Sequence, residues 1–162
     1  MKNFLVAALI GCASVAAVAA DTQESYVSGF VGRSEYKFDG EREHHTGFGV
    51  AFGQSLSEFT GYEVGYAHLG SFDQADGSGH SLYLAGLAKY SVNNEFSVYG
   101  KIGPTVNYAS GEDSETRVRL LLGAGVSYKF DQNWAATLEY NHFGKTLDVK
   151  PSLWSVGLRY YY

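Results

Sequence analysis

The sequence predicts an all-β protein: an eight-stranded antiparallel transmembrane β-barrel of meander topology that follows a cleaved signal peptide. Three observations predict it. Apolar and polar residues alternate in eight successive segments, long and short connections alternate between these segments, and aromatic residues gather near the segment ends. The composition agrees, because 20 Gly, 13 Tyr and 10 Phe with only 2 Pro favour strands and tight turns.

Residues 1–20 are predicted to be a signal peptide. Lys2 supplies the positive start, residues 4–10 form the apolar stretch, and small residues lead to a cut after Ala20. The apolar run is short for a spanning helix and lacks a basic stop signal. A lipid-attachment box ends at Cys12, but cleavage there would leave an apolar segment on the mature chain. We therefore expect a signal peptide at 1–20 and a barrel domain at 21–162.

Charge and cysteine content limit the partners that the chain could have. The formal net charge is −5 and no run of basic residues occurs, so nucleic acid, which needs clustered Lys and Arg, is not an expected partner. Cys12 is the only cysteine and lies in the predicted signal peptide. The mature chain is therefore expected to have neither a disulfide nor thiol chemistry.

The segments of alternating residues define the expected strands, because a period of two places successive side chains on opposite faces. No segment after the signal peptide keeps a helical period. The strands are expected at residues 25–38, 46–55, 60–70, 80–91, 95–108, 116–129, 133–143 and 152–162.

The connections differ in length at the two ends of the predicted barrel. Short turns at one end and longer loops at the other are typical of outer-membrane barrels, whose longer loops lie outside the cell. The even number of strands returns both termini to the periplasmic side. The longer connections are residues 39–45, 71–79, 109–115 and 144–151, and the shorter ones are residues 56–59, 92–94 and 130–132.

Aromatic residues near the strand ends indicate which face is turned to lipid. Two girdles of amphipathic rings match the two interfaces of a membrane, so the apolar face is expected to point outward and the polar face into the lumen. A soluble, lipocalin-like barrel is the alternative, and it would need an apolar lumen. In lipid the sheet must close, so the first and last strands must pair. The expected girdles are Tyr26, Tyr62, Tyr90, Phe96, Tyr128, Trp134 and Tyr160 at the periplasmic end, and Tyr36, Phe48, Tyr108, Tyr140 and Trp154 at the other.

Several strand motifs have a characteristic order and spacing. They are Gly61-Tyr62-Glu63-Val64-Gly65-Tyr66, Tyr99-Gly100-Lys101-Ile102-Gly103, Gly123-Ala124-Gly125-Val126-Ser127-Tyr128, Leu138-Glu139-Tyr140 and Trp154-Ser155-Val156-Gly157-Leu158-Arg159-Tyr160. These motifs resemble a known group, the small outer-membrane barrels that include the OmpA transmembrane domain, the OmpX/Ail proteins and the opacity proteins, and the resemblance covers nearly the whole mature chain. It implies a Gram-negative outer-membrane location, contact with membrane lipids and lipopolysaccharide, and insertion by the barrel assembly machinery. A small closed barrel has no need of partner chains, so a monomer is expected.

The end of the chain resembles the C-terminal signal that the assembly machinery reads in this family. Phe is the commoner last residue there, so Tyr162 is a mild departure. The residues of this expected signal are Trp154, Val156, Leu158, Tyr160 and Tyr162.

Charged residues of the polar face are the first candidate functional site. An eight-stranded barrel has an interior just wide enough for side chains, so charges inside it must be paired. We expect a fixed polar plug, with a gate of rearranging ion pairs as the alternative. Ser127 and Thr137 stand where OmpA has a charged pair, which weakens the transfer of its gate. The expected lumen charge network consists of Glu63, Lys89, Lys101, Arg119, Glu139 and Arg159.

The outer loops and the histidines are further candidates. The loops are acidic and are expected to be ordinary solvated segments; binding of divalent cations or of host or surface ligands is the alternative. His44 and His45 are adjacent on an extended chain and point to opposite sides, which makes a poor chelate. His142 lacks the serine two residues later that lipid A deacylases of this size use. The acidic loop residues are Asp39, Glu41, Glu43, Asp73, Asp76, Glu112, Asp113 and Glu115.

The sequence thus predicts an outer-membrane barrel with a structural and surface-interaction role in envelope integrity, extending to adhesion. No enzymatic activity, catalytic residue, cofactor or metal site is expected. A narrow pore for small solutes, gated by the lumen ion pairs, is the alternative function, and a lipid A-modifying enzyme is the third.

Overall fold

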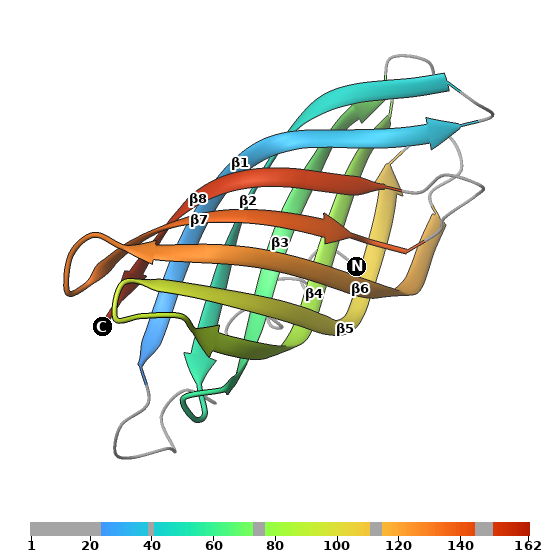
Figure 1. The fold of residues 1–162 in the computed structure, drawn as a ribbon. Coiled ribbons are helices and arrows are strands. Elements are labelled where there is room, and N and C mark those ends of the chain that lie inside the picture. The colour runs from blue at the N-terminus through green and yellow to red at the C-terminus, as the bar shows by residue number, and fades with distance from the viewer. Residues whose placement is uncertain (1–23, 39–40, 73–76, 111–114, 145–150) are drawn as a thin grey trace.

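Eight antiparallel strands form a closed barrel in which each strand pairs with the next and β8 returns to β1 (Figure 1). The computed structural model describes residues 24–38, 41–72, 77–110, 115–144 and 151–162. The predicted signal peptide lies outside these described residues. The strands are β1 (Ser25–Phe38), β2 (Glu41–Ser55), β3 (Thr60–Phe72), β4 (Gly77–Ser91), β5 (Phe96–Ser110), β6 (Glu115–Lys129), β7 (Trp134–His142) and β8 (Ser152–Tyr161).

The predicted eight-stranded meander is confirmed, and the errors lie at the loop end. Residues 41–45 were expected in a loop but belong to β2, which pairs with β1 up to Phe38↔Glu41. Strand β3 continues to Phe72, and β4 already begins at Gly77. The longest of these extensions, Glu41-Arg42-Glu43-His44-His45, is polar throughout its sequence, so the alternation that marks a strand is missing there although the backbone ladder continues.

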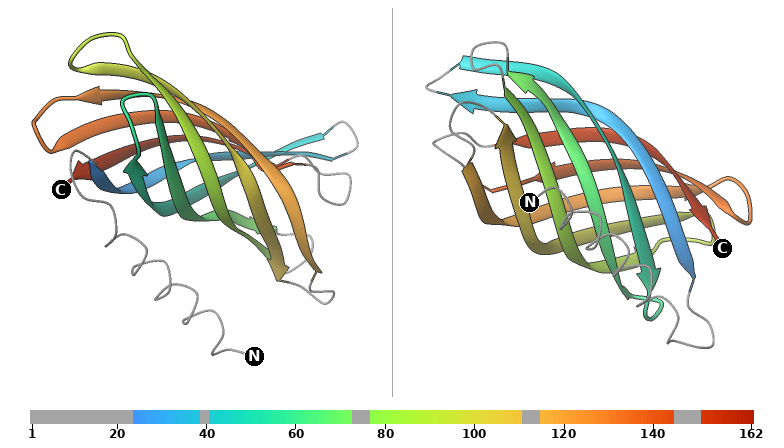
Figure 2. Two further views of the ribbon diagram at one scale, coloured as in Figure 1. Left: turned by 90° about the horizontal axis from the view of Figure 1, so that it is seen from below. Right: turned by 180° about the vertical axis from the view of Figure 1, so that it is seen from behind.

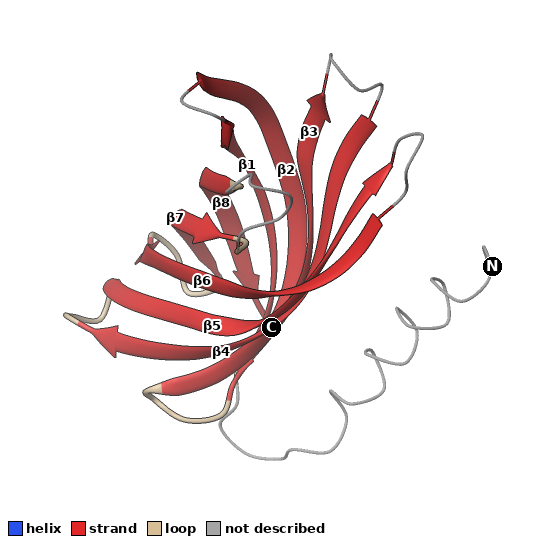
Figure 3. Ribbon diagram, turned by 90° about the vertical axis from the view of Figure 1, so that its right-hand side faces the viewer, coloured by secondary structure: helices blue, strands red, loops and turns tan. Residues whose placement is uncertain are grey.

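Closure of the barrel depends on the pairing of the first and last strands. The β1–β8 ladder runs from Tyr26↔Tyr161 to Glu35↔Ser152. The ring of strands is seen from below and from behind in Figure 2, and from the side of the loops in Figure 3. The backbone groups of β1 and β8 are thereby paired, as a strand in lipid requires. In Figure 1 the C-terminus and the start of β1 lie at the end that carries the short turns.

Alternate residues point outward and inward along the strands. In β7, Leu138 is 45% exposed, whereas its neighbours Thr137 and Glu139 are each 7% exposed. The same holds in β8, where Trp154 is exposed and Ser155 is buried. The outer face is therefore apolar, while the lumen holds the charges. A soluble barrel with an apolar lumen does not fit this arrangement.

The aromatic girdles are largely where the sequence predicted them, with one error. Tyr90, Tyr128, Trp134 and Tyr160 lie on the outer face near the short turns. Tyr26 was expected among them but is only 4% exposed and points into the lumen. An aromatic ring suits either environment, so its residue type alone did not decide the face. The side chain of Tyr36 lies outside the described part of the structure.

A bulge interrupts the β3–β4 ladder near the loop end. The register shifts between His68 and Gly70, and Gly70 adopts a φ of 105°, which favours glycine. The extra residue, Leu69, is buried in the lumen. Within the described ranges, no helix is long and apolar enough to cross a membrane.

Candidate functional site: the barrel lumen

Four charged side chains form one layer inside the barrel, in the half nearer the short turns. Lys101 Nζ on β5 lies 2.9 Å from Glu63 Oε1 on β3 and 2.6 Å from Glu139 Oε2 on β7. Arg159 on β8 lies between the same two carboxylates, with its Nη2 3.6 Å from Glu63 Oε2 and 3.6 Å from Glu139 Oε1. Two cations thus bridge two carboxylates, and the layer carries no net charge.

Three tyrosines donate hydrogen bonds to this layer. The Tyr26 hydroxyl donates to Glu63 Oε2 at 2.7 Å, and the Tyr83 hydroxyl donates to Glu63 Oε1 at 2.9 Å. The Tyr99 hydroxyl donates to Glu139 Oε1 at 2.5 Å. Each carboxylate oxygen therefore has a phenol or ammonium partner, which offsets the cost of removing the charge from water.

The cations also contact the faces of these tyrosine rings. The guanidinium carbon of Arg159 lies 4.0 Å from the centre of the Tyr26 ring and 5.1 Å from that of Tyr99. Lys101 Nζ lies 5.2 Å from the centre of the Tyr83 ring. These cation–π contacts add attraction in a desolvated site. They also hold the cations in place between the carboxylates.

Inward-facing glycines make room for the tyrosines. Each of the three rings lies across a glycine that is its direct cross-strand partner: Tyr26↔Gly53, Tyr83↔Gly65 and Tyr99↔Gly125. A Cβ at Gly53 would lie 2.2 Å from the Tyr26 ring, and a Cβ at Gly65 would lie 2.4 Å from the Tyr83 ring. A larger residue would therefore displace the ring, and with it the hydroxyl that holds the carboxylate.

An apolar layer fills the lumen above the charged layer, toward the loops. Leu121 and Leu153 are 0% exposed and Phe143 is 1% exposed, although all three point into a barrel with a polar lower half. Leu69 at the bulge completes this layer. Tyr83 joins the two layers, because its ring contacts Phe143 edge-on at 6.5 Å between centres and its hydroxyl holds Glu63.

Two hollows of the described part lie at the mouth and on the outer wall. The periplasmic mouth, between Tyr26, Lys89 and Arg159, holds a hollow of about 20 Å³, which is room for about one water molecule. A broader, shallow hollow of about 610 Å³ lies on the lipid-facing wall over Gly100 and Ala124. Acyl chains of the bilayer can fill that surface.

The structure brings together four of the six charges that were predicted to form the lumen network. Glu63, Lys101, Glu139 and Arg159 form the layer described above. Lys89 is half-buried at the mouth and Arg119 is half-buried nearer the loops, and neither pairs with a carboxylate of the described residues. The three tyrosines were missed. The alternation along the strands could have revealed them, because residues an even number of positions apart share a face. Tyr99 shares its face with Lys101, and Tyr26 shares its face with Ser28 and Ser34.

The other candidate residues lie apart from the lumen. The C-terminal residues Trp154, Val156, Leu158 and Tyr160 share the lipid-facing side of β8, and Tyr162 follows that strand. His142 has Ser152 as its cross-strand neighbour, but the Ser152 hydroxyl donates to the carbonyl of Glu35 at 3.5 Å. The Ser152 hydroxyl is thus oriented toward a backbone carbonyl.

The acidic loops predicted from the sequence cannot be placed as a site. Asp39, Asp73, Asp76, Glu112 and Asp113 lie outside the described residues, as do the side chains of three further acidic residues. These three are Glu41, Glu43 and Glu115.

Comparison with known proteins gives concordant matches. A family model described as "Outer membrane protein beta-barrel domain" matches residues 5–161. Outer membrane protein A of Yersinia pseudotuberculosis is 30% identical over 96% of the chain and 53% of the relative. Outer membrane protein A of Salmonella typhi is 28% identical over 99% of the chain and 55% of the relative. The chain spans about half the length of these curated relatives.

Solved structures share the fold. Neisserial surface protein A superimposes with a TM-score of 0.69 at 17% identity, over 86% of this chain and 99% of that one. Ail, the attachment invasion locus protein of Yersinia pestis, superimposes with a TM-score of 0.66 at 25% identity, over 86% and 99% of the two chains. That Ail structure is a complex with the heparin analogue sucrose octasulfate.

Proposed function

The chain belongs to the outer membrane protein β-barrel domain family, and on that premise we propose that it is a closed structural barrel that contributes to envelope integrity and presents its loop end for surface interactions. Its location is the cell outer membrane, where the apolar outer face contacts lipid. Export would use residues 1–20 as a cleaved signal peptide, so the N-terminal residue of the mature protein is expected to be Asp21.

The filled lumen is the observation that carries the structural role. Ions or solutes would have to pass both the Glu63–Lys101–Glu139 bridge and the layer around Leu121 and Phe143. Opening the first requires separating buried, hydrogen-bonded charges, and opening the second requires moving close-packed apolar side chains. A barrel whose lumen is blocked at two levels supports a structural role over a pore.

Single-channel recording in a planar bilayer tests this proposal. Folded wild-type protein, verified by a different gel mobility before and after heating, is expected to leave the bilayer silent. Steady openings whose conductance changes in Glu63→Ala would favour the alternative function, a narrow pore gated by the lumen ion pairs. Lys129→Met is the matched control, because Lys129 lies at the rim and pairs with exposed Glu24 at 3.1 Å.

Surface interaction is the second part of the proposed role. The strands that continue beyond their predicted ends, such as β2 from Glu41, form hairpins at the loop end. Ail, a structural relative, was crystallised with a heparin analogue, but the predicted loops of this chain are rich in acidic residues. We therefore expect weak binding to heparin and stronger binding to basic surfaces. Adhesion of cells to heparin-coated and polylysine-coated surfaces tests this expectation. The comparison is between cells that express the barrel with its hairpin tips and cells that express it without them.

The proposed role involves no reaction on lipid A. The orientation of Ser152 toward the Glu35 carbonyl supports this. Mass spectra of lipid A from overexpressing cells are expected to match those from control cells. A lost acyl chain that returns in Ser152→Ala would show that the chain is an enzyme.

A further inference from the structure

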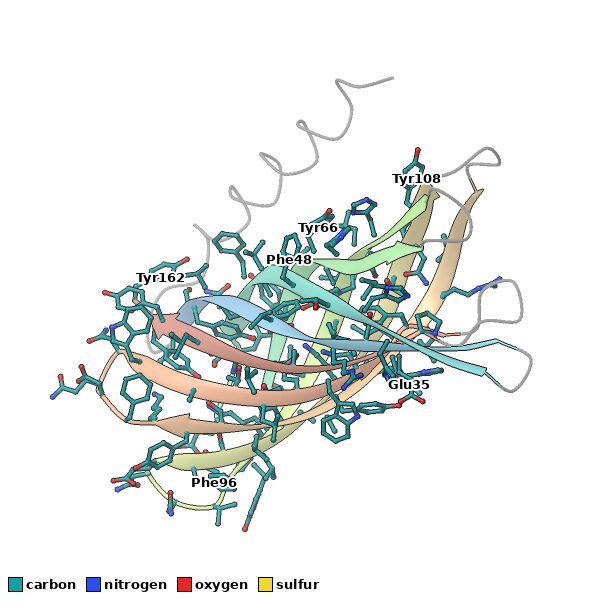
Figure 4. All side chains as sticks on the ribbon, turned by 90° about the horizontal axis from the view of Figure 1, so that it is seen from above. Glu35, Phe48, Tyr66, Phe96, Tyr108 and Tyr162 are labelled. Atoms are coloured by element: carbon teal, nitrogen blue, oxygen red, sulfur yellow. The ribbon has the colours of Figure 1, made fainter. Side chains whose placement is uncertain are left out.

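A pair of histidines lies on the outer face of the barrel near the loop end. His68 on β3 and His80 on β4 are direct cross-strand partners, next to the bulge at Gly70. They belong to a row of four rings that crosses four strands, because Phe48 pairs with His68 and Tyr108 pairs with His80. Phe48, Tyr66 and Tyr108 are labelled in Figure 4, where they mark this part of the wall.

The two imidazoles present nitrogen atoms to each other. His68 Nδ1 and His80 Nδ1 are 3.4 Å apart, and the ring centres are 4.9 Å apart at an angle of 47°. The Tyr66 hydroxyl oxygen lies 2.6 Å from the same His80 Nδ1. Two nitrogens and one oxygen therefore converge from adjacent strands on one point of the surface.

The spacing of these nitrogens matches a metal site. Two imidazole nitrogens that bind one zinc ion tetrahedrally, each at about 2.0–2.1 Å, lie about 3.3 Å apart. Imidazole is a preferred ligand of Zn²⁺, Cu²⁺ and Ni²⁺, whereas Mg²⁺ and Ca²⁺ prefer oxygen. Both histidines are half-buried, so part of each residue is accessible from outside the barrel. The Phe48 ring centre lies 5.0 Å from that of His68, and the Tyr66 ring centre lies 5.9 Å from that of His80, so each imidazole packs against a neighbouring ring.

We propose that His68 Nδ1 and His80 Nδ1, with the Tyr66 hydroxyl as third donor, bind a late first-row divalent cation such as Zn²⁺ or Cu²⁺. The ion links β3 to β4 at the outer rim, and water completes its coordination. Tyr66 supplies the third protein ligand that the two histidines lack. No group of three or more His, Cys, Asp or Glu side chains in the described residues could hold a metal. The site was not predicted from the sequence, because the two histidines are twelve positions apart in the chain and only the strand register brings them together.

Copper titration of the folded, tag-free protein in detergent micelles tests the site. The variants His68→Phe and His80→Phe keep the row of rings but remove the nitrogens. His44→Phe is the matched control, because His44 is an exposed histidine on β2 whose cross-strand partner is Glu35 and not a histidine. Wild type and His44→Phe are expected to bind one Cu²⁺ with equal affinity. Each of the other two variants loses one of the two nitrogen ligands and is expected to lose at least about tenfold in affinity, which corresponds to about 1.4 kcal/mol.

The electron paramagnetic resonance spectrum of bound Cu²⁺ gives the second measurement. Two equatorial nitrogens are expected in wild type and one in each phenylalanine variant. Protons compete with the metal ion for the same nitrogens, so affinity is expected to fall as the solution is made more acidic. Equal affinity of all variants, or loss in only one of the two, would overturn the paired site. Unchanged binding in Tyr66→Phe would overturn the assignment of the third donor.

Discussion

The two layers of the lumen close the barrel by different physics. In the lower layer, Lys101 and Arg159 each bridge the carboxylates of Glu63 and Glu139, so every member depends on the others. In the upper layer, Leu121 and its neighbours only fill space. Removing one member of the lower layer leaves an uncompensated charge, whereas removing one member of the upper layer leaves a cavity. The charged layer is therefore expected to fail more abruptly than the apolar layer.

Lys101→Met should cause the largest loss of stability. Methionine keeps most of the side-chain length but removes the ammonium that bonds to Glu63 at 2.9 Å and to Glu139 at 2.6 Å. The two buried carboxylates then share a single cation, Arg159. We expect a loss of about 3–5 kcal/mol in the free energy of unfolding, measured by urea titration in lipid vesicles.

The rim lysine provides the control for this change. Lys129 pairs with Glu24 at 3.1 Å, but the Glu24 side chain is half exposed. Lys129→Met is expected to cost about 0–1 kcal/mol. Equal urea midpoints for the two variants would mean that burial of the charges does not set their importance.

Leu121→Ala probes the apolar layer and is expected to cost about 2–5 kcal/mol. Leu121 is 0% exposed, and the space that it leaves cannot be refilled from the packed lumen. Its chain neighbour Leu120 is 51% exposed on the lipid-facing wall, where acyl chains can take the place of the lost atoms. Leu120→Ala should therefore cost less. The same urea titration compares them, and a larger cost for Leu120→Ala would contradict the assignment of the two faces.

Conductance separates the roles of the two layers as seals. Leu121→Ala leaves the charged layer whole, so it is expected to remain silent in a planar bilayer. Openings in this variant, with none in Lys101→Met, would mean that the apolar layer is the effective seal.

The sequence predicted the strands well because each strand has one face in lipid. The alternation of Leu138 and Glu139 reports that environment directly. Beyond the bilayer both faces of a hairpin are wet, so the start of β2 at Glu41 carried no such signal. The same alternation also placed Glu63, Lys101, Glu139 and Arg159 on the inner face.

The alternation of residues shows which face of the sheet a side chain occupies, but it does not show how far along the barrel axis the side chain lies. Lys89 and Arg119 face inward like the four residues of the charged layer, but Lys89 lies nearer the short turns than that layer and Arg119 lies nearer the loops. Tyr26 was assigned to the girdle because rings occupy both the girdle and the lumen. The cross-strand partner Gly53 is what shows that the Tyr26 ring belongs to the lumen and not to the girdle. The pairing of Tyr26 with Gly53 depends on a strand register that the sequence did not specify.

Tyr99→Phe tests the hydrogen bonds that the sequence missed. The change removes only the hydroxyl that donates to Glu139 at 2.5 Å and leaves the ring over Gly125. A hydrogen bond to a charged group contributes about 1.5–3 kcal/mol, and a loss of that size in unfolding free energy is expected. Tyr90→Phe is the control, since Tyr90 is 64% exposed on the outer wall and should change stability little. Equal effects would remove the phenols from the charged layer.

Gly65→Ala should have the smallest effect, but its sign is the sharpest test of how the lumen is built. The added Cβ would lie 2.4 Å from the Tyr83 ring, which cannot move without losing its bond to Glu63 and its contact with Phe143. Overpacking of this kind costs about 1–3 kcal/mol. Gly29→Ala adds the same methyl group on the outer face of β1, where nothing lies within 4 Å, and should stabilise by about 0.4–1 kcal/mol. Opposite shifts of the urea midpoint are therefore expected from one chemical change. A neutral Gly65→Ala would mean that the tyrosine is not held by the glycine beneath it, and that the charged layer tolerates movement of its donors.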